Sequence, residues 1–336
     1  MSAIGSVPRP SVLALRALGL GDFLAGVPAY RALRRAFPAH EVVLAAPRVL
    51  APLVPLTGAI DALVPVGELR PVPWRGAPPD VGVDLHGCGP ASHDLVAALS
   101  PRRLVVFGGA GGGGYPGPRW RADEHERVRW CRLLAESGIP ADPHDLILAT
   151  PNHPLPRALV GASVVHPGAA SPARRWPPER FAALVRVLAD DGHRVVVTGG
   201  ADDDARVALV AGAVGTVAGR TDLARLAALI AAARVVVSGD TGVAHLAAAF
   251  ARPSVTLFGP TPPAHWGPPA DPRHRVLWPA SAEYRGDPHG RTVDPVLAAI
   301  EVEEVARAVR RALAGPPASP SVPCRSSDTG GRRALS

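Results

Sequence analysis

The strongest constraint on the fold is a stretch in which an apolar run, a polar turn and a small-residue helix follow one another and then begin to repeat. Residues 234–268 read RVVVSGDTGVAHLAAAFARPSVTLFGPTPPAHWGP. Val235–Val237 predicts a buried strand, Val243–Phe250 a helix and Ser254–Phe258 a second strand. Both polar turns therefore follow strand ends, where open α/β sheets bind ligands. The turn at 238–242 also opens a helix, whose free N–H groups and dipole favour an anion such as a phosphate.

The rest of the chain alternates strands and helices in the same way, which predicts parallel, doubly wound sheets. Strands are expected at 11–15, 41–45, 62–66, 81–85, 103–107, 163–166 and 194–198, and helices at 23–37, 93–99, 123–137, 178–190, 201–211, 221–233 and 294–314. The expected divisions are a flexible N-terminus at 1–10, Rossmann-like domains at 11–155 and 156–300 joined near the Pro-rich segment 151–157, and a disordered tail at 315–336. A ligand would bind in the cleft between the two domains.

Composition narrows the classes of function. The net charge is +7 and all 36 basic residues are arginine, so mechanisms that use a lysine nucleophile are excluded. The positive charge is spread without a basic run, and nucleic-acid binding is not expected. Peripheral contact with the anionic inner face of a membrane stays open.

Neither a disulfide framework nor a membrane span is indicated. The cysteines at 88, 131 and 324 are scattered singly, which also argues against a Cys-based metal site. No apolar run reaches the roughly 18 residues of a transmembrane helix, and the N-terminus lacks a convincing signal peptide. We therefore expect a cytoplasmic protein.

Asp22 lies in the segment ALGLGDFLAGVPA, directly after the first expected strand. Glycines at 19 and 21 allow a tight turn there. One interpretation is a helix N-cap, since Asp satisfies free N–H groups at a helix start. The other is a general base that faces the cleft and removes a hydroxyl proton from an attacking acceptor. The residues alone leave both open.

A second anion-binding motif is expected at VVHPGAASPARRWPPERF, residues 164–181. Its loop of small residues around Ser171 allows a phosphate to approach the backbone, and Arg174 and Arg175 supply charged donors. The alternative is two solvated arginines beside a core tryptophan. His245, in the first turn of the helix after 238–242, is expected to face the same anion as Thr241 and Gly242, with Asp240 supporting the loop.

Further candidates are weaker. Asp202 follows the strand that ends near Gly199 and is a candidate for binding ribose hydroxyls, although helix-start acids occupy such positions equally well. The run Gly111–Gly114 lacks the lysine and the spacing of a phosphate loop, and we interpret it as a flexible loop. No His, Cys, Asp or Glu set has metal-ligand spacing, so no essential metal is expected.

Four segments together resemble glycosyltransferase family 9, the heptosyltransferases: residues 18–38, VDLHG at 83–87, 166–181 and 238–268. The resemblance implies a GT-B fold with a C-terminal helix that crosses back to the first domain. It implies an inverting, metal-independent transfer without a cofactor, in cell-envelope glycan biosynthesis. The donor would be a nucleoside diphosphate sugar such as ADP-heptose, and the acceptor a glycan, glycolipid or small molecule.

The resemblance also assigns roles to individual residues. Asp22 matches the proposed catalytic base, and Arg174 matches the basic residue, commonly Lys, that neutralises the donor diphosphate. The donor-binding loop comprises Asp240, Thr241, Gly242 and His245. Asp202 matches the acid near the donor ribose, and His86 lies where the first domain approaches the acceptor.

The sequence departs from the family on the acceptor side. The loops at 67–80 and 108–120 carry no Lys/Arg cluster that would bind lipid A phosphates, which argues against a lipopolysaccharide acceptor. Two alternatives to a transferase follow from the same motifs. They are a GT-B epimerase or hydrolase of nucleotide sugars and a non-catalytic nucleotide-sugar-binding protein.

Overall fold

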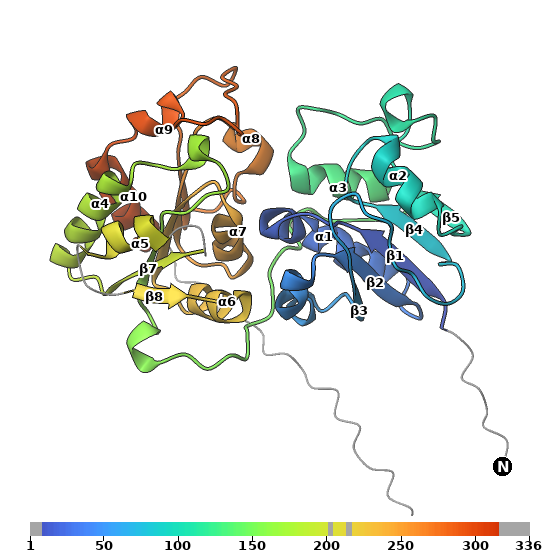
Figure 1. Cartoon of the computed structure of the whole chain (residues 1–336), viewed down its shortest axis with the longest axis horizontal. Helices are drawn as coiled ribbons and strands as arrows, with labels where there is room; N and C mark the ends of the chain where they lie inside the picture. The colour runs from blue at the N-terminus through green and yellow to red at the C-terminus, as the bar shows by residue number, and fades with distance from the viewer. Residues whose placement is uncertain (1–8, 201–203, 213–216, 316–336) are drawn as a thin grey trace, which may run out of the picture.

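A computed structural model describes residues 9–200, 204–212 and 217–315. The chain forms two α/β domains that lie side by side (Figure 1). The first contains β1 (Ser11–Leu15), α1 (Leu20–Ala36), β2 (Glu41–Ala46), η1 (Arg48–Leu53), η2 (Pro55–Thr57), β3 (Ala62–Pro65), β4 (Val81–Asp84), α2 (Pro90–Ala97), β5 (Arg103–Val105), η3 (Ala110–Gly112) and α3 (Glu126–Glu136). These strands form a parallel sheet in the order β3-β2-β1-β4-β5.

The second domain repeats the architecture with a longer sheet. It contains η4 (Arg157–Leu159), β6 (Ser163–His166), η5 (Pro172–Arg174), α4 (Pro178–Asp190), β7 (Val195–Gly199), α5 (Asp204–Ala211), β8 (Val217–Arg220), α6 (Leu223–Ala231), β9 (Val235–Gly239), α7 (Gly242–Ala249), β10 (Ser254–Leu257), α8 (Pro263–Trp266), β11 (His274–Leu277), α9 (Pro295–Ala299) and α10 (Val302–Leu313). Its order is β11-β10-β9-β6-β7-β8, again parallel. The predicted doubly wound fold is confirmed.

The strands form where the sequence has continuous apolar runs, because a parallel sheet is covered on both faces. Val12–Leu15 of β1 and Val235–Val237 of β9 are almost completely buried. One face of the first sheet packs against α1 and α3, and the other packs against α2 and the loop that contains Val72. Both domains therefore have substantial cores built mainly from Val, Leu and Ala.

The two domains meet along an apolar seam between α1 and α7, which face each other in the middle of Figure 1. Phe23, Leu24 and Val27 of α1 share one buried cluster with Val243 and Leu246 of α7. Each helix follows the central strand of its own sheet. The seam therefore brings two strand ends, and the turns that follow them, close together.

Two glycines permit this close approach. A Cβ on Gly21 would lie 3.1 Å from Cδ2 of His245, and a Cβ on Gly242 would lie 2.7 Å from the side chain of Leu20. Neither distance leaves room for an ordinary side chain without movement of its neighbour. Gly21, next to Asp22, and Gly242, which opens α7, are thus required by contact between the domains.

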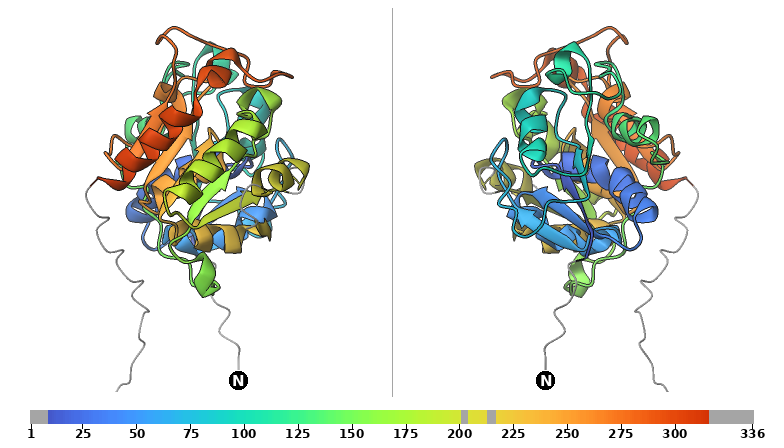
Figure 2. Two further views of the ribbon diagram at one scale, coloured as in Figure 1. Left: turned by 90° about the vertical axis from the view of Figure 1, so that its left-hand side faces the viewer. Right: turned by 90° about the vertical axis from the view of Figure 1, so that its right-hand side faces the viewer.

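The C-terminal segment differs from the prediction. In place of one helix over 294–314, α9 and α10 are separate, because Glu301 forms a capping box with Glu304 and starts a new helix. Val305, Val309 and Ala312 of α10 are buried in the core of the second domain. Accordingly α10 lies beside α4 (Figure 2) and packs on its own domain, and it does not cross back to the first.

Smaller differences concern ends and short elements. The first helix begins at Leu20, three residues earlier than predicted, and β8, β11 and α8 were not predicted. Residues 1–8 of the predicted flexible N-terminus at 1–10, and residues 316–336 of the predicted tail at 315–336, lie outside the described residues, as does Cys324. Within the described ranges, no helix combines the length and apolarity needed to cross a membrane.

Candidate active site

A hollow of about 510 Å³ lies at the junction of the domains, where the turns after β1, β6 and β9 meet. It is lined by Gly19, Leu20, Gly21, Asp22, Ala170, Arg174, Asp240, Thr241, Gly242, His245, Thr261, Trp266, Pro288 and His289. The structure thus brings together the predicted base and most of the predicted donor-binding residues, although they come from segments more than 200 positions apart. We call this the reaction hollow.

A second hollow of about 350 Å³ adjoins the first and shares Leu20, Ala170, Thr241 and Gly242 with it. Its other residues are His166, Gly168, Ala169, Arg175, Gly199, Gly200, Thr221, Leu226 and Val243. They follow the ends of neighbouring strands of the second sheet, where α/β folds bind nucleotides. We call it the nucleoside hollow, and the two together form one elongated site.

Asp22 occupies the third position of α1, and it is not the N-cap. The N-cap is Gly19, and no side chain caps the helix. The carboxylate accepts a hydrogen bond from Nη2 of Arg16 at 3.3 Å and is still 28% exposed toward the reaction hollow. Burial raises its pKa, while Arg16 and backbone N–H groups partly offset that rise. The position combines access to a ligand with a carboxylate that is more basic than usual.

Arg16 is a buried cation that sequence reasoning missed. Its side chain is fully buried, contacts Glu126 at 2.9 Å, and donates to the backbone carbonyls of Asp22 and Leu85. Its guanidinium carbon lies 4.9 Å from the ring centroid of Trp130, whose indole N–H donates to the same Glu126 at 2.8 Å. In the sequence, the only sign of a buried cation was a single charged residue at the end of the apolar run VLALR.

Arg174 is the main positive charge in the reaction hollow. Among the described residues, its Nε is buried without a hydrogen-bond partner, and no hydrogen bond or salt bridge from its guanidinium is found. The backbone here is tightly packed, since a Cβ on Gly239 would lie 3.0 Å from the carbonyl oxygen of Arg174. Because the Arg174 side chain is half-buried and forms no ion pair within the described residues, its charge is available to an anionic ligand.

The N-terminus of α7 faces the same space. Thr241 is the N-cap, and its hydroxyl accepts a hydrogen bond from the N–H of Val243 at 3.3 Å. The preceding residue, Asp240, is buried, which raises its pKa to about 6, although Arg174 acts in the opposite direction. A helix start of this kind, together with Arg174, suits an anionic group.

His245 contributes a neutral ring to the hollow. Burial, with the nearby positive charges of Arg127 and His125, lowers its pKa to about 4. At neutral pH it is therefore a hydrogen-bonding group and carries no charge. Its ring stands edge-on to Trp266, with 5.8 Å between the centroids. Thr261, Trp266 and His289 also line the hollow. For Thr261 and Trp266, the sequence signal was the turn that follows the strand at 254–257.

Other predicted residues lie at the margin. Arg175 lines the nucleoside hollow, with its Nε held by the carbonyl of Ala169 at 2.8 Å. Ser171 lines neither hollow, and its hydroxyl donates to the carbonyl of Pro288. His86 also lies outside both hollows, since its Nδ1 accepts the N–H of Ala17 at 3.2 Å. Asp202 falls outside the described residues.

No metal centre is found in the described part of the chain, where no group of three or more His, Cys, Asp or Glu is placed to hold an ion. Metal independence stays a prediction. Charge neutralisation of a bound diphosphate would depend on Arg174 and the N-terminus of α7.

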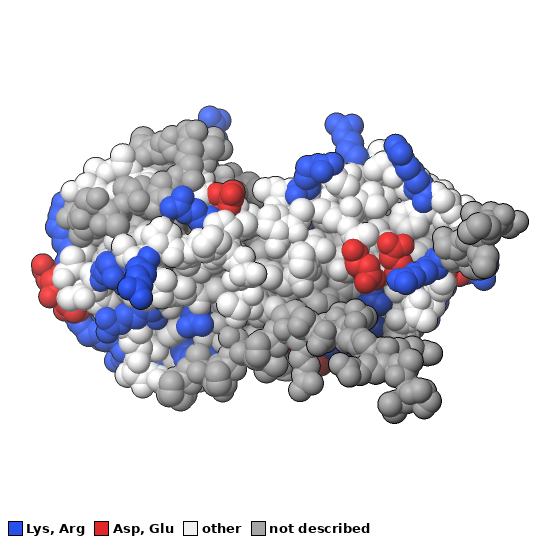
Figure 3. Space-filling model, turned by 90° about the horizontal axis from the view of Figure 1, so that it is seen from below, with Lys and Arg blue, Asp and Glu red and all other residues white. Residues whose placement is uncertain are grey.

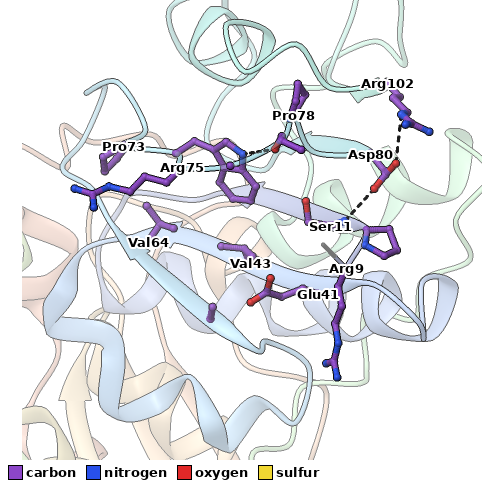
Figure 4. Close-up of a pocket in the computed structure, with 15 residues that line it drawn as sticks. Arg9, Ser11, Glu41, Val43, Val64, Pro73, Arg75, Pro78, Asp80 and Arg102 are labelled. Carbon is purple, nitrogen blue, oxygen red and sulfur yellow. Dashed lines mark hydrogen bonds and ion pairs between the residues drawn. The ribbon is translucent and has the colours of Figure 1, made fainter. Parts of the chain in front are cut away.

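A separate hollow of about 770 Å³ lies at the opposite edge of the first sheet (Figure 4). It is formed by the beginnings of β1, β2 and β3 and by the loop that carries Trp74 and Arg75. Asp80 bonds the N–H of Ser11 at 3.0 Å and lies 3.5 Å from Arg102. Because ligands of α/β sheets bind at the carboxyl ends of strands, this hollow is not the candidate active site.

Comparisons with known proteins identify a similar family and similar folds. Residues 142–286 match the model of glycosyltransferase family 9 (heptosyltransferase). No curated protein matches the sequence. Similar solved structures include the ADP-heptose LPS heptosyltransferase II of E. coli, with 23% identity, a TM-score of 0.71, and coverage of 90% of this chain and 98% of that one.

Two further structures are similar. A glycosyltransferase family 9 protein of Veillonella parvula shows 20% identity and a TM-score of 0.71, over 90% of this chain and 97% of that one. The E. coli heptosyltransferase WaaC, solved with ADP, shows 19% identity and a TM-score of 0.67, over 90% and 99%. These similar structures show that the chain has the GT-B fold, two parallel-sheet α/β domains. The family match over residues 142–286 agrees with the resemblance that the sequence indicates.

Proposed function

We propose that this chain is an inverting glycosyltransferase that moves a sugar from a nucleoside diphosphate donor to an acceptor hydroxyl, with Asp22 as general base. The observation that carries the proposal is the unpaired Arg174 beside the open N-terminus of α7, in the same hollow as Asp22. The nucleoside would occupy the adjoining hollow. Because similar structures were solved with ADP or with ADP-2-deoxy-2-fluoro heptose, an ADP-heptose-like donor is the first to test.

The proposed reaction is a single displacement. The acceptor oxygen forms a bond to the anomeric carbon as its proton passes to the Asp22 carboxylate. The bond from that carbon to the diphosphate oxygen breaks, and the nucleoside diphosphate leaves with the electron pair. Asp22 belongs to the first domain, whereas Arg174 and α7 belong to the second. Base and leaving group would thus lie on opposite sides of the sugar, as inversion requires.

The electrostatics fit these roles. A carboxylate whose pKa is raised toward working pH is a better base than an ordinary Asp. Arg174 and the helix N-terminus would stabilise the charge that develops on the diphosphate. Neutral His245 can donate or accept a hydrogen bond without adding charge.

The test of the base is Asp22→Asn. We expect kcat to fall at least about 100-fold, the lower range for loss of a general base, with donor affinity nearly unchanged. Unchanged turnover would remove Asp22 from this role. Release of free sugar from the donor without an acceptor would instead identify a nucleotide-sugar hydrolase.

The test of the donor site is Arg174→Ala. Loss of a charged hydrogen bond worth about 1.5–3 kcal/mol should weaken ADP binding roughly 10- to 100-fold in calorimetry. Arg186→Ala is the matched control, because Arg186 is exposed on α4, outside both hollows. Equal ADP affinity in the two variants would contradict the assignment of Arg174.

A further inference from the structure

A third hollow, of about 850 Å³, opens beside the donor site where η1 of the first domain meets α6 of the second. Its walls are largely apolar and include Pro47, Val49, Leu50, Leu223 and Leu226. Figure 3 shows the face that carries α6 and η1, and its visible middle, where the domains meet, is mostly uncharged. We call it the apolar hollow.

The apolar hollow exposes side chains that the fold itself leaves uncovered. Val49 is 67% exposed, although it follows directly on the buried strand β2 and the turn at Pro47. Leu223 and Leu226 are only partly buried and pack on the core that joins the domains. An exposed aliphatic side chain with partly buried aliphatic neighbours, next to a ligand site, is typical of a surface that a ligand covers.

The apolar hollow is continuous with the site already described. It shares Gly19 and Leu20 with the reaction hollow, and Leu20, Thr221 and Leu226 with the nucleoside hollow. A molecule lying on Val49 would therefore reach Gly19 and Leu20, at the start of the helix that carries Asp22. The proposed function assigns the nucleoside to the nucleoside hollow on the second domain, which leaves the acceptor as the molecule that this surface fits.

The rim of the apolar hollow also carries polar side chains that can bind the polar end of a ligand. Arg48 and Glu68 line the same hollow and are both exposed. Glu68 acts electrostatically on His86, which places the carboxylate near the residue expected on the acceptor side. Hydroxyl groups can bond to Glu68 and Arg48 while an apolar chain lies on Val49 and Leu223.

We propose that the apolar hollow binds the apolar portion of an amphiphilic acceptor, an alkyl or aryl aglycone attached to the hydroxylated group that is glycosylated. The proposal rests on the proposed function, since it names the acceptor class of the same enzyme. It accounts for the lack of a basic cluster for a phosphorylated acceptor in the loops at 67–80 and 108–120.

The test compares two probes that differ only in the aglycone, methyl β-glucoside and n-octyl β-glucoside, below the concentration at which the latter forms micelles. Binding to the full chain with saturating ADP is measured by calorimetry. The octyl compound should bind at least about tenfold more tightly, because burial of several methylene groups favours binding by more than the energy of one tenfold step.

Three variants locate the effect. Val49→Asp should abolish the octyl preference, whereas Val49→Leu should keep it. Val160→Asp is the matched control, because Val160 is also exposed, at 50%, but lies outside the three hollows of the site. Equal binding of both probes to the native chain, or an octyl preference that survives Val49→Asp, would overturn the proposal.

The readout separates this proposal from the proposed function. Binding of the probes needs no transfer, so a chain that transfers no sugar can still show the octyl preference. Conversely, an active enzyme that binds both probes equally would keep its transferase function and lose the proposed acceptor class.

Discussion

Replacement of Arg16 by methionine tests how the candidate base is held. Arg16 is fully buried and links Asp22, at 3.3 Å, with Glu126, at 2.9 Å. Methionine approximates the length of the aliphatic stem but removes the charge, so both carboxylates lose their common partner. We expect Arg16→Met to lower both the stability of the fold and the activity of the enzyme.

The stability effect can be worked out from the contacts. Breaking a buried ion pair costs about 3–5 kcal/mol, because the remaining charge stays buried. Glu126 keeps Arg129 and the indole N–H of Trp130, and Asp22 keeps partial access to solvent. We therefore expect the lower end, about 3 kcal/mol of unfolding free energy at pH 7. Urea denaturation followed by tryptophan fluorescence measures this loss.

The variant should also respond differently to pH. Arg16 lowers the pKa of both carboxylates, so that of Glu126 lies below its usual range while that of Asp22, dominated by burial, lies above. Glu126 therefore stabilises the fold above its unfolded pKa, and this stability is lost as pH falls through the folded value. Asp22 has the opposite sign, so its charged form costs stability as pH rises. Without Arg16 both pKa values rise, and destabilisation should be larger at pH 7 than at pH 4.

The pH–rate profile gives a second readout. The acidic limb of kcat should move to higher pH in Arg16→Met, because Asp22 ionises later. Arg16→Lys should restore part of the effect, since the charge returns without the planar fork. A loss of less than about 1 kcal/mol, typical of an exposed pair, together with an unmoved acidic limb, would refute this reasoning.

Two further predictions concern the turns at the domain junction. Gly21→Ala should lower kcat/KM about tenfold with less than about 1.5 kcal/mol of destabilisation, because the new Cβ would lie 3.1 Å from the ring of His245. Gly111→Ala is the control, because a Cβ on Gly111 would meet nothing within 4 Å. Equal kcat/KM values in the two variants would contradict the importance of the contact with His245. Asp240→Asn should raise the unfolding free energy at pH 7 by up to about 3 kcal/mol. Burial raises the pKa of Asp240 from 3.8 to about 6, so the charged carboxylate costs stability as pH rises between these two values. The neutral amide of Asn removes that cost. Urea titrations at pH 4 and pH 7 measure this effect. If the unfolding free energy changes between the two pH values by the same amount in the native chain and in the variant, the prediction is contradicted.

The regular elements follow from local sequence, whereas the details of the site depend on tertiary contacts. Val12–Leu15 predicts a strand because its apolar run is continuous. The break before α10 needs the reciprocal bonds of Glu301 and Glu304, which resemble ordinary helix-surface acids in the sequence. Likewise Asp22 follows two glycines and resembles a cap, but the fold places Gly19 at that position.

The residues that surround the base could not be predicted for a related reason. Arg16 and Glu126 are 110 positions apart, and only packing of α3 beside α1 brings them together. For Ser171 the local pattern was misleading. Its loop of small residues suggested a phosphate contact, but its hydroxyl donates to the carbonyl of Pro288, a residue far away in the sequence. Local pattern identifies the turns that form the site, and long-range packing decides which side chains face it.

The apolar seam between α1 and α7 also sets how the two domains can move. If one domain rotates about this seam relative to the other, each atom moves in proportion to its distance from the seam. Asp22 and Thr241 lie next to the seam and would keep nearly constant separation. The outer contacts of Asp123 with His265, at 3.7 Å, and Arg285, at 3.8 Å, would separate most. A rotation that breaks these outer contacts and leaves the seam intact would widen the space between the domains while Asp22 and Thr241 keep their alignment.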